Sequence, residues 1–132
     1  MTKRSELILV GVASIFGLLL LGVSYLGLPY DQTGLPTALS PIGLVWLSFA
    51  AALGGLARLA RPWTCCLALA AVVPATVILR IAADVTIDPT RHNLWPFEIG
   101  LSLGVGLIDV IPAFWVARAL RALWQALRAN GR

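Results

Sequence analysis

Residues 80–100, RIAADVTIDPTRHNLWPFEIG, contain five charged residues and the single histidine of a chain that is otherwise strongly apolar. Arginine, carboxylate and histidine side chains form ion pairs, donate and accept hydrogen bonds, and transfer protons. We therefore predict that this segment contacts a ligand or a partner protein. The candidate contact residues are Arg80, Asp84, Asp88, Arg91, His92, Asn93 and Glu98.

Arg80 and Asp109 are ionisable residues that the pattern places inside apolar runs. Such residues are costly in a membrane and usually face other helices or a polar cavity. Asp84 follows Arg80 by four residues, so one helix face brings the two together, and Glu98 is a second candidate partner. Asp109 is expected to be held by local hydrogen bonds, with Thr76 as one candidate, to be protonated, or to bind a proton or cation.

An enzymatic role has little support in the motifs. His92 is the single histidine, and no paired nucleophile or second metal ligand accompanies it. Cys65 and Cys66 are adjacent and fall at the opposite end of an apolar run from His92, so they are interpreted as small apolar residues or a palmitoylation site. Nucleotide-binding loops and zinc-hydrolase motifs are absent from the sequence. We predict no metal, no cofactor and no enzymatic activity, with His92 as a general base as the alternative.

The elements that position these residues are apolar runs. The chain has 132 residues, of which 59% are hydrophobic and 12% charged, and its mean hydropathy is +0.89. About 20 apolar residues cross a hydrocarbon core of ~30 Å, so we expect one membrane domain, residues 1–132, with four spans. The predicted spans are residues 7–28, 42–57, 63–83 and 97–117.

The basic residues predict the orientation, because short loops rich in lysine and arginine stay on the cytoplasmic side. Ten basic residues give the chain a net charge of +4. Eight of them lie at the two ends and in the loop after the second span, which predicts cytoplasmic termini in a plasma (inner) membrane, and no nucleic-acid binding is needed to explain the charge. These eight are Lys3, Arg4, Arg58, Arg61, Arg118, Arg121, Arg128 and Arg132. A cleavable signal peptide is the alternative interpretation of the first span.

The tail, residues 116–130, has a different pattern from the spans. Apolar residues recur there at steps of three and four, and arginines share the opposite face, which predicts a basic amphipathic helix. We expect it to lie at the inner membrane surface with its arginines toward anionic lipid headgroups. A docking helix for a cytoplasmic protein partner is the alternative.

Small residues recur at four-residue spacing within three spans, and such pairs let helix backbones approach closely. They predict packing within one bundle or, alternatively, the contact between copies of a homo-oligomer. The pairs are Ala13 with Gly17, Ala50 with Gly54, Ala51 with Gly55, Gly100 with Gly104, and Ser102 with Gly106.

Together these patterns predict an all-α integral membrane protein whose four transmembrane helices form an antiparallel bundle with a C-terminal amphipathic helical extension. In size and number of spans the chain resembles the small membrane subunit of tripartite tricarboxylate transporters. No motif is shared, so no property of that family is transferred to it.

The function predicted from the sequence is that of a small non-enzymatic membrane protein, an accessory or assembly subunit that engages a partner or small ligand through residues 80–98. The alternative is a homo-oligomeric carrier or channel for a small solute or ion, using Arg80 and Asp109.

Overall fold

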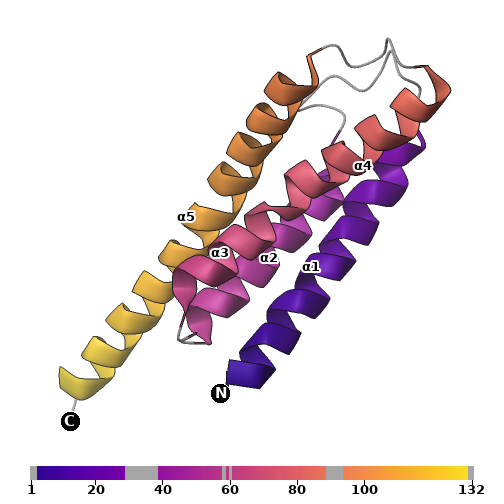
Figure 1. The fold of residues 1–132 in the computed structure, drawn as a ribbon. Helices are drawn as coiled ribbons and strands as arrows, with labels where there is room; N and C mark the ends of the chain where they lie inside the picture. Colours follow the sequence, from indigo (N-terminus) through magenta and orange to yellow (C-terminus); the bar gives the residue numbers. More distant parts are fainter. Residues whose placement is uncertain (1–2, 29–38, 58, 60, 89–93, 131–132) are drawn as a thin grey trace.

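The computed structural model describes residues 3–28, 39–57, 59, 61–88 and 94–130. Helices make up 91% of these residues, and no strand occurs among them. In chain order the elements are α1 (Lys3–Leu26), α2 (Pro41–Leu56), α3 (Pro62–Ala70), α4 (Val72–Ile87) and α5 (Trp95–Asn130). Both termini lie at the same end of the molecule (Figure 1).

Three of the helical segments are long and apolar enough to cross a membrane. They are Arg4–Leu26, Pro62–Ile87 and Trp95–Asn130, while Pro41–Leu56 is a shorter apolar helix of 16 residues. At 1.5 Å per residue, α2 is about 24 Å long, which is less than the ~30 Å of a typical hydrocarbon core. Large apolar side chains cover the outside of the molecule, among them Leu7, Val23 and Ile108. Long apolar helices with an apolar outer surface are typical of a membrane protein.

A break at Ala71 separates α3 from α4, and its cause is Pro74. Proline has no backbone N–H, so it cannot donate to the carbonyl of Ala70, four residues before it. The helical ladder continues on both sides, because Ala71 N donates to Leu67 O at 2.9 Å and Ala75 N donates to Ala71 O at 3.0 Å. The predicted span 63–83 is therefore present as two helices that follow one another from Pro62 to Ile87.

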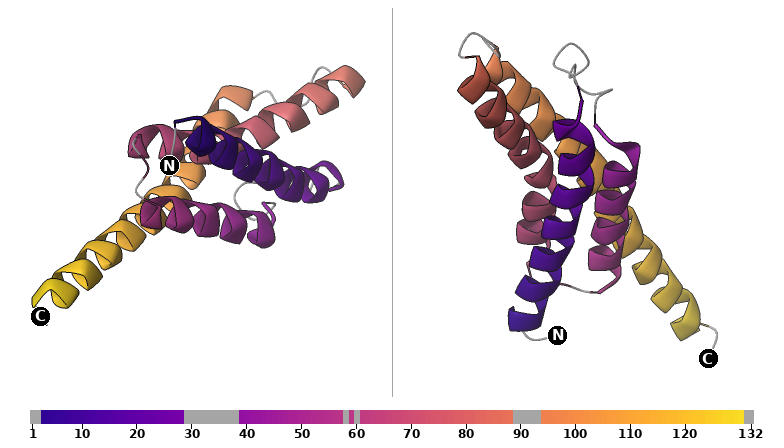
Figure 2. Two further views of the ribbon diagram at one scale, coloured as in Figure 1. Left: turned by 90° about the horizontal axis from the view of Figure 1, so that it is seen from below. Right: turned by 90° about the vertical axis from the view of Figure 1, so that its right-hand side faces the viewer.

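The last helix continues from the fourth span into the predicted helical extension. The fourth span and the basic tail form one helix of 36 residues, about 54 Å long, which exceeds the thickness of a hydrocarbon core. Its C-terminal part leaves the other helices in both views of Figure 2, and most of residues 118–130 are exposed. The tail is thus a straight extension of α5.

Small residues allow α2 to pack closely against α1 and α5. A Cβ added to Gly55 would collide with the backbone carbonyl of Phe114 on α5, and one added to Gly17 would lie 2.8 Å from Cδ2 of Leu47. Trp46 reinforces the α1 contact, since its indole N–H donates to Ala13 O at 3.0 Å. Packing within one chain accounts for these glycines, as one of the two interpretations predicted.

The two pairs of small residues in the fourth span have different surroundings. Ser102 is buried, and a Cβ on Gly106 would collide with the carbonyl of Ala70. Gly100 and Gly104, by contrast, have no atom within 4 Å of an added Cβ. One face of α5 therefore packs within the chain, and the other does not.

Candidate functional site

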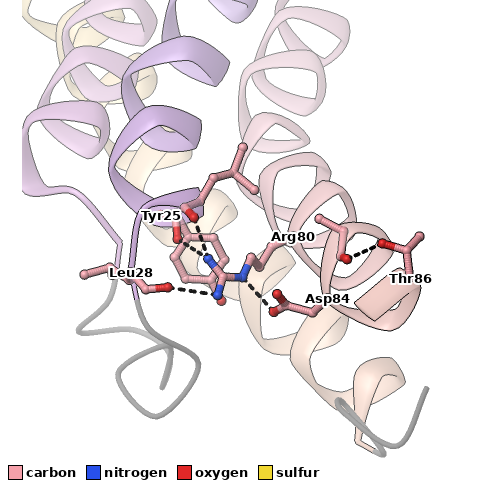
Figure 3. Close-up of polar contacts among 7 residues, drawn as sticks. Tyr25, Leu28, Arg80, Asp84 and Thr86 are labelled. Atoms are coloured by element: carbon pink, nitrogen blue, oxygen red, sulfur yellow. Dashed lines mark hydrogen bonds and ion pairs between the residues drawn. The ribbon is translucent and has the colours of Figure 1, made fainter. Parts of the chain in front are cut away.

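Arg80 is the most extensively bonded polar side chain of the described residues, and it is only 6% exposed. It lies on α4 and extends to the C-terminal end of α1 (Figure 3). Its Nη1 donates to Tyr25 O at 2.9 Å and to Leu26 O at 2.8 Å, and its Nη2 donates to Leu28 O at 2.9 Å. The last carbonyls of a helix have no partner within the helix and carry the negative end of its dipole. Arg80 therefore caps α1 and joins it to α4.

Asp84 completes this arrangement from the next turn of α4. Arg80 Nε donates to Asp84 Oδ2 at 2.7 Å, and each of the two side chains is 7% exposed. The pair predicted from the four-residue spacing is therefore present. A buried ion pair gains little net stability over apolar residues, but a charge left without its partner is strongly destabilising. The two residues consequently act as one unit.

A small apolar cluster includes Tyr25, a contact of Arg80 that is not among the predicted contact residues. Tyr25 and Val77 are buried together, with Leu28 packed against them. The backbone carbonyl of Tyr25 is one of the acceptors of the Arg80 guanidinium. In the sequence, Tyr25 has no charged neighbour that marks it as a partner of Arg80.

Glu98 belongs to the first turn of α5, where a carboxylate complements the positive end of the helix dipole. Pro96 is the second residue of the same helix. The first N–H groups of a helix have no acceptor within it, so a proline removes no hydrogen bond at this position. Asp88 follows the end of α4, and its backbone N–H donates to Asp84 O at 2.9 Å. Both carboxylates are half-buried, whereas Asp84 is buried.

Three predicted contact residues, Arg91, His92 and Asn93, lie outside the residues that the structure describes. Their contact with a ligand or partner stays a prediction, and so does the alternative role of His92 as a general base.

Asp109 lies in the middle of α5 and is bonded to α2. Ser48 donates its hydroxyl proton to Asp109 Oδ1 at 2.7 Å, and the same hydroxyl lies 3.3 Å from Asp109 O. The other carboxyl oxygen, Oδ2, is buried and has no hydrogen-bond partner among the described residues. Thr76, which we considered as a partner, donates instead to Val72 O at 2.9 Å.

The two ionisable residues predicted to lie inside the membrane belong to separate contacts. Arg80 joins α4 to α1, and Asp109 joins α5 to α2. None of the contacts found among the described residues links one to the other. A transport path that uses both residues would therefore have to connect two different helix pairs.

The cysteines are consistent with a packing role. Cys65 and Cys66 are buried free thiols at the start of α3. A Cβ on Gly54 would lie 3.3 Å from the Cys65 sulfur, so this thiol fills the space beside the α2 glycine. The residues that the structure describes contain no group of three or more His, Cys, Asp and Glu side chains able to hold a metal ion.

Comparison with known proteins gives no relative: no family model, no curated protein and no solved structure matches the chain.

Proposed function

We propose that this chain is a small non-enzymatic subunit of an inner-membrane complex, with four antiparallel spans, cytoplasmic termini and an outer segment, residues 80–98, that engages a partner. The observation that carries the proposal is the set of hydrogen bonds that the Arg80 side chain donates. Four of its five N–H donors serve the C-terminal carbonyls of α1 and the carboxylate of Asp84. A guanidinium bound in this way holds two helices together and supports a fixed outer surface.

The half-buried carboxylates at the proposed outer end are better placed to contact a partner than the buried Arg80–Asp84 pair. Asp84 is 5% exposed and is engaged by Arg80, so it belongs to the scaffold. Glu98 and Asp88 lie beside it at the ends of α5 and α4, where a partner can reach them. Exposed apolar side chains flank them, including Leu94, Trp95 and Phe97. Aromatic residues next to charges are typical of contact surfaces between proteins.

The proposed orientation predicts the result of cysteine labelling in intact cells. Leu94, directly before the first residue of α5, is 68% exposed, and Asn130 is exposed at the end of α5. With Cys65 and Cys66 replaced by alanine, Leu94→Cys should react with a membrane-impermeant maleimide, and Asn130→Cys should react only after permeabilisation. The reverse pattern would contradict the orientation.

The partner role is tested by co-purification in mild detergent, with mass spectrometry of the proteins that accompany the chain. Glu98 and Glu6 are matched, because each is a half-buried carboxylate in the first turn of a helix, one at each end of the molecule. We expect a foreign subunit to accompany the wild-type chain and the Glu6→Ala variant. Glu98→Ala should reduce its recovery about tenfold, as expected for a charged contact of 1.4 kcal/mol. Equal recovery with both variants would exclude Glu98 from the contact.

Asp109 supports a second candidate function, a homo-oligomeric carrier or channel. A buried carboxyl oxygen without a hydrogen-bond partner among the described residues is unusual and is a feature of proton and cation sites in membranes. The Ser48 hydroxyl beside it supplies a further oxygen ligand. Loss of a pH-dependent flux in Asp109→Asn, with the fold retained, would favour this function over the first.

A further inference from the structure

We propose that a cavity at the inner end of the molecule, between the C-terminal end of α2 and the α5 tail, binds the phosphate group of an anionic phospholipid. The cavity has a volume of about 320 Å³ and is lined by Gly55, Arg118, Arg121, Ala122 and Gln125. Two of these five residues are cationic, and none is acidic. The proposed membrane placement supplies the source of the phosphate, whereas the chemistry of the cavity does not depend on a protein partner.

Arg118 carries the argument, because its hydrogen bonds are incomplete. Its Nη1 is buried and has no hydrogen-bond partner among the described residues. A buried guanidinium nitrogen without an acceptor is costly, so a stable protein normally provides one. Arg80 shows the contrast within the same chain, since its donors are bonded to Asp84 and to three carbonyls. Arg118 lines a cavity that can hold the missing acceptor.

The fold keeps Arg118 in this position. Gly55 lets α5 approach α2 closely. A Cβ added to Gly55 would lie only 3.2 Å from the backbone nitrogen of Arg118. The guanidinium carbon lies 5.7 Å from the centre of the Trp115 ring, a cation–π contact that also holds the side chain. Arg121 and Gln125 follow at three and seven residues, on the same face of the helix. All three polar side chains line the cavity.

A phosphate ester matches these donors in charge and size. Arginine binds phosphate oxygens with two parallel N–H donors, and such charge-assisted hydrogen bonds are among the strongest in proteins. The volume corresponds to roughly ten water molecules of ~30 Å³ each, enough for a phosphate and part of its glycerol. Two arginines favour a headgroup with net negative charge over one that also carries a cation.

The surroundings of the cavity indicate a lipid as the source of the phosphate. Next to the lining residues in the sequence, Leu56 follows Gly55, Leu120 lies between Arg118 and Arg121, and both leucines are exposed. Acyl chains can lie along these side chains while the headgroup occupies the cavity. The C-terminal part of α5, which contributes Arg118, Arg121, Ala122 and Gln125 to the cavity, leaves the other helices (Figure 2). A single site of this kind is more specific than the general attraction of a basic tail to a charged surface.

The test measures lipid binding to the purified full-length chain in a neutral detergent, by intact mass of the protein–lipid complex. Short-chain phosphatidylglycerol is compared with phosphatidylcholine of the same chains and with inorganic phosphate. Arg128 provides the matched control, because it lies on the same helix above Trp124 and does not line the cavity. Arg118→Gln and Arg121→Gln should each weaken phosphatidylglycerol binding about tenfold, and Arg128→Gln should leave it unchanged.

Three results would overturn the proposal. Equal weakening by Arg128→Gln would mean that the tail attracts anionic lipid through its general charge. Displacement of the lipid by inorganic phosphate at equal concentration would assign the site to a free anion. If Arg118→Gln does not fold, unchanged phosphatidylglycerol binding by Arg121→Gln would remove the cavity from the interaction.

Discussion

Replacing Arg80 by alanine is expected to lower the melting temperature of the detergent-solubilised protein by about 10 to 20 °C. The change breaks the buried ion pair with Asp84 and removes the cap from the end of α1. Removing one partner of a buried pair costs about 3 to 5 kcal/mol, and 1 kcal/mol corresponds to roughly 2 to 8 °C in proteins of this size range. Thermal unfolding followed by circular dichroism measures the effect.

Arg128→Ala is the control for this prediction, because Arg128 is an exposed arginine on the α5 tail. Its loss should cost about 0 to 1 kcal/mol, as for other exposed charges. A double-mutant cycle with Asp84→Asn adds a second readout, since the two residues are in contact and their effects should deviate from additivity by about 0.5 to 3 kcal/mol. An Arg80→Ala protein as stable as Arg128→Ala would show that the arginine extends to the headgroups and does not hold α1.

Gly106→Ala is expected to destabilise the protein by about 1 to 3 kcal/mol, the usual cost of inserting a methyl group into a packed interior. The new Cβ would collide with the backbone carbonyl of Ala70, which cannot move aside as a flexible side chain can. That carbonyl is the one that Pro74 leaves without its helical donor. Because Gly106 has no side chain, α5 can pack directly against the junction of α3 and α4.

Gly104→Ala is the matched control, two residues away on the same helix, with nothing within 4 Å of its added Cβ. Alanine has a higher helix propensity than glycine by about 1 kcal/mol, so this variant should be as stable as the wild type or more stable. Thermal unfolding of the two variants in the same detergent measures the difference. If both changes had the same effect, the contact of Gly106 with Ala70 would not contribute to stability.

The long apolar helices could be predicted from the sequence because a membrane leaves few alternatives to them. Backbone polar groups in hydrocarbon must be bonded internally, so apolar runs of sufficient length become helices. The continuity of α5 with its tail also has a local cause, since residues 113–130 contain neither glycine nor proline and are rich in alanine, leucine and arginine. The sequence therefore predicts a helical extension of the fourth span, and α5 has this form.

Side-chain contacts were predictable only where both partners lie on the same helix. The Arg80–Asp84 pair follows from a spacing of four residues. The capping of α1 by Arg80 joins residues more than 50 positions apart, and the Ser48–Asp109 hydrogen bond joins residues 61 positions apart. No local pattern encodes the register of α2 against α5. Ser48 nevertheless left a signal, because it is the single hydroxyl residue in the predicted span 42–57.

The role of Asp109 distinguishes a structural membrane subunit from a carrier most directly, and Asp109→Asn in proteoliposomes tests it. Asparagine retains an oxygen that can accept the Ser48 hydroxyl proton, and it removes the group that titrates. The proposed function predicts that the variant folds normally and that its proton and cation flux, measured across a pH gradient, equals that of the wild type. A pH-dependent flux in the wild type that disappears in the folded variant would contradict the proposal and assign the chain to the carriers.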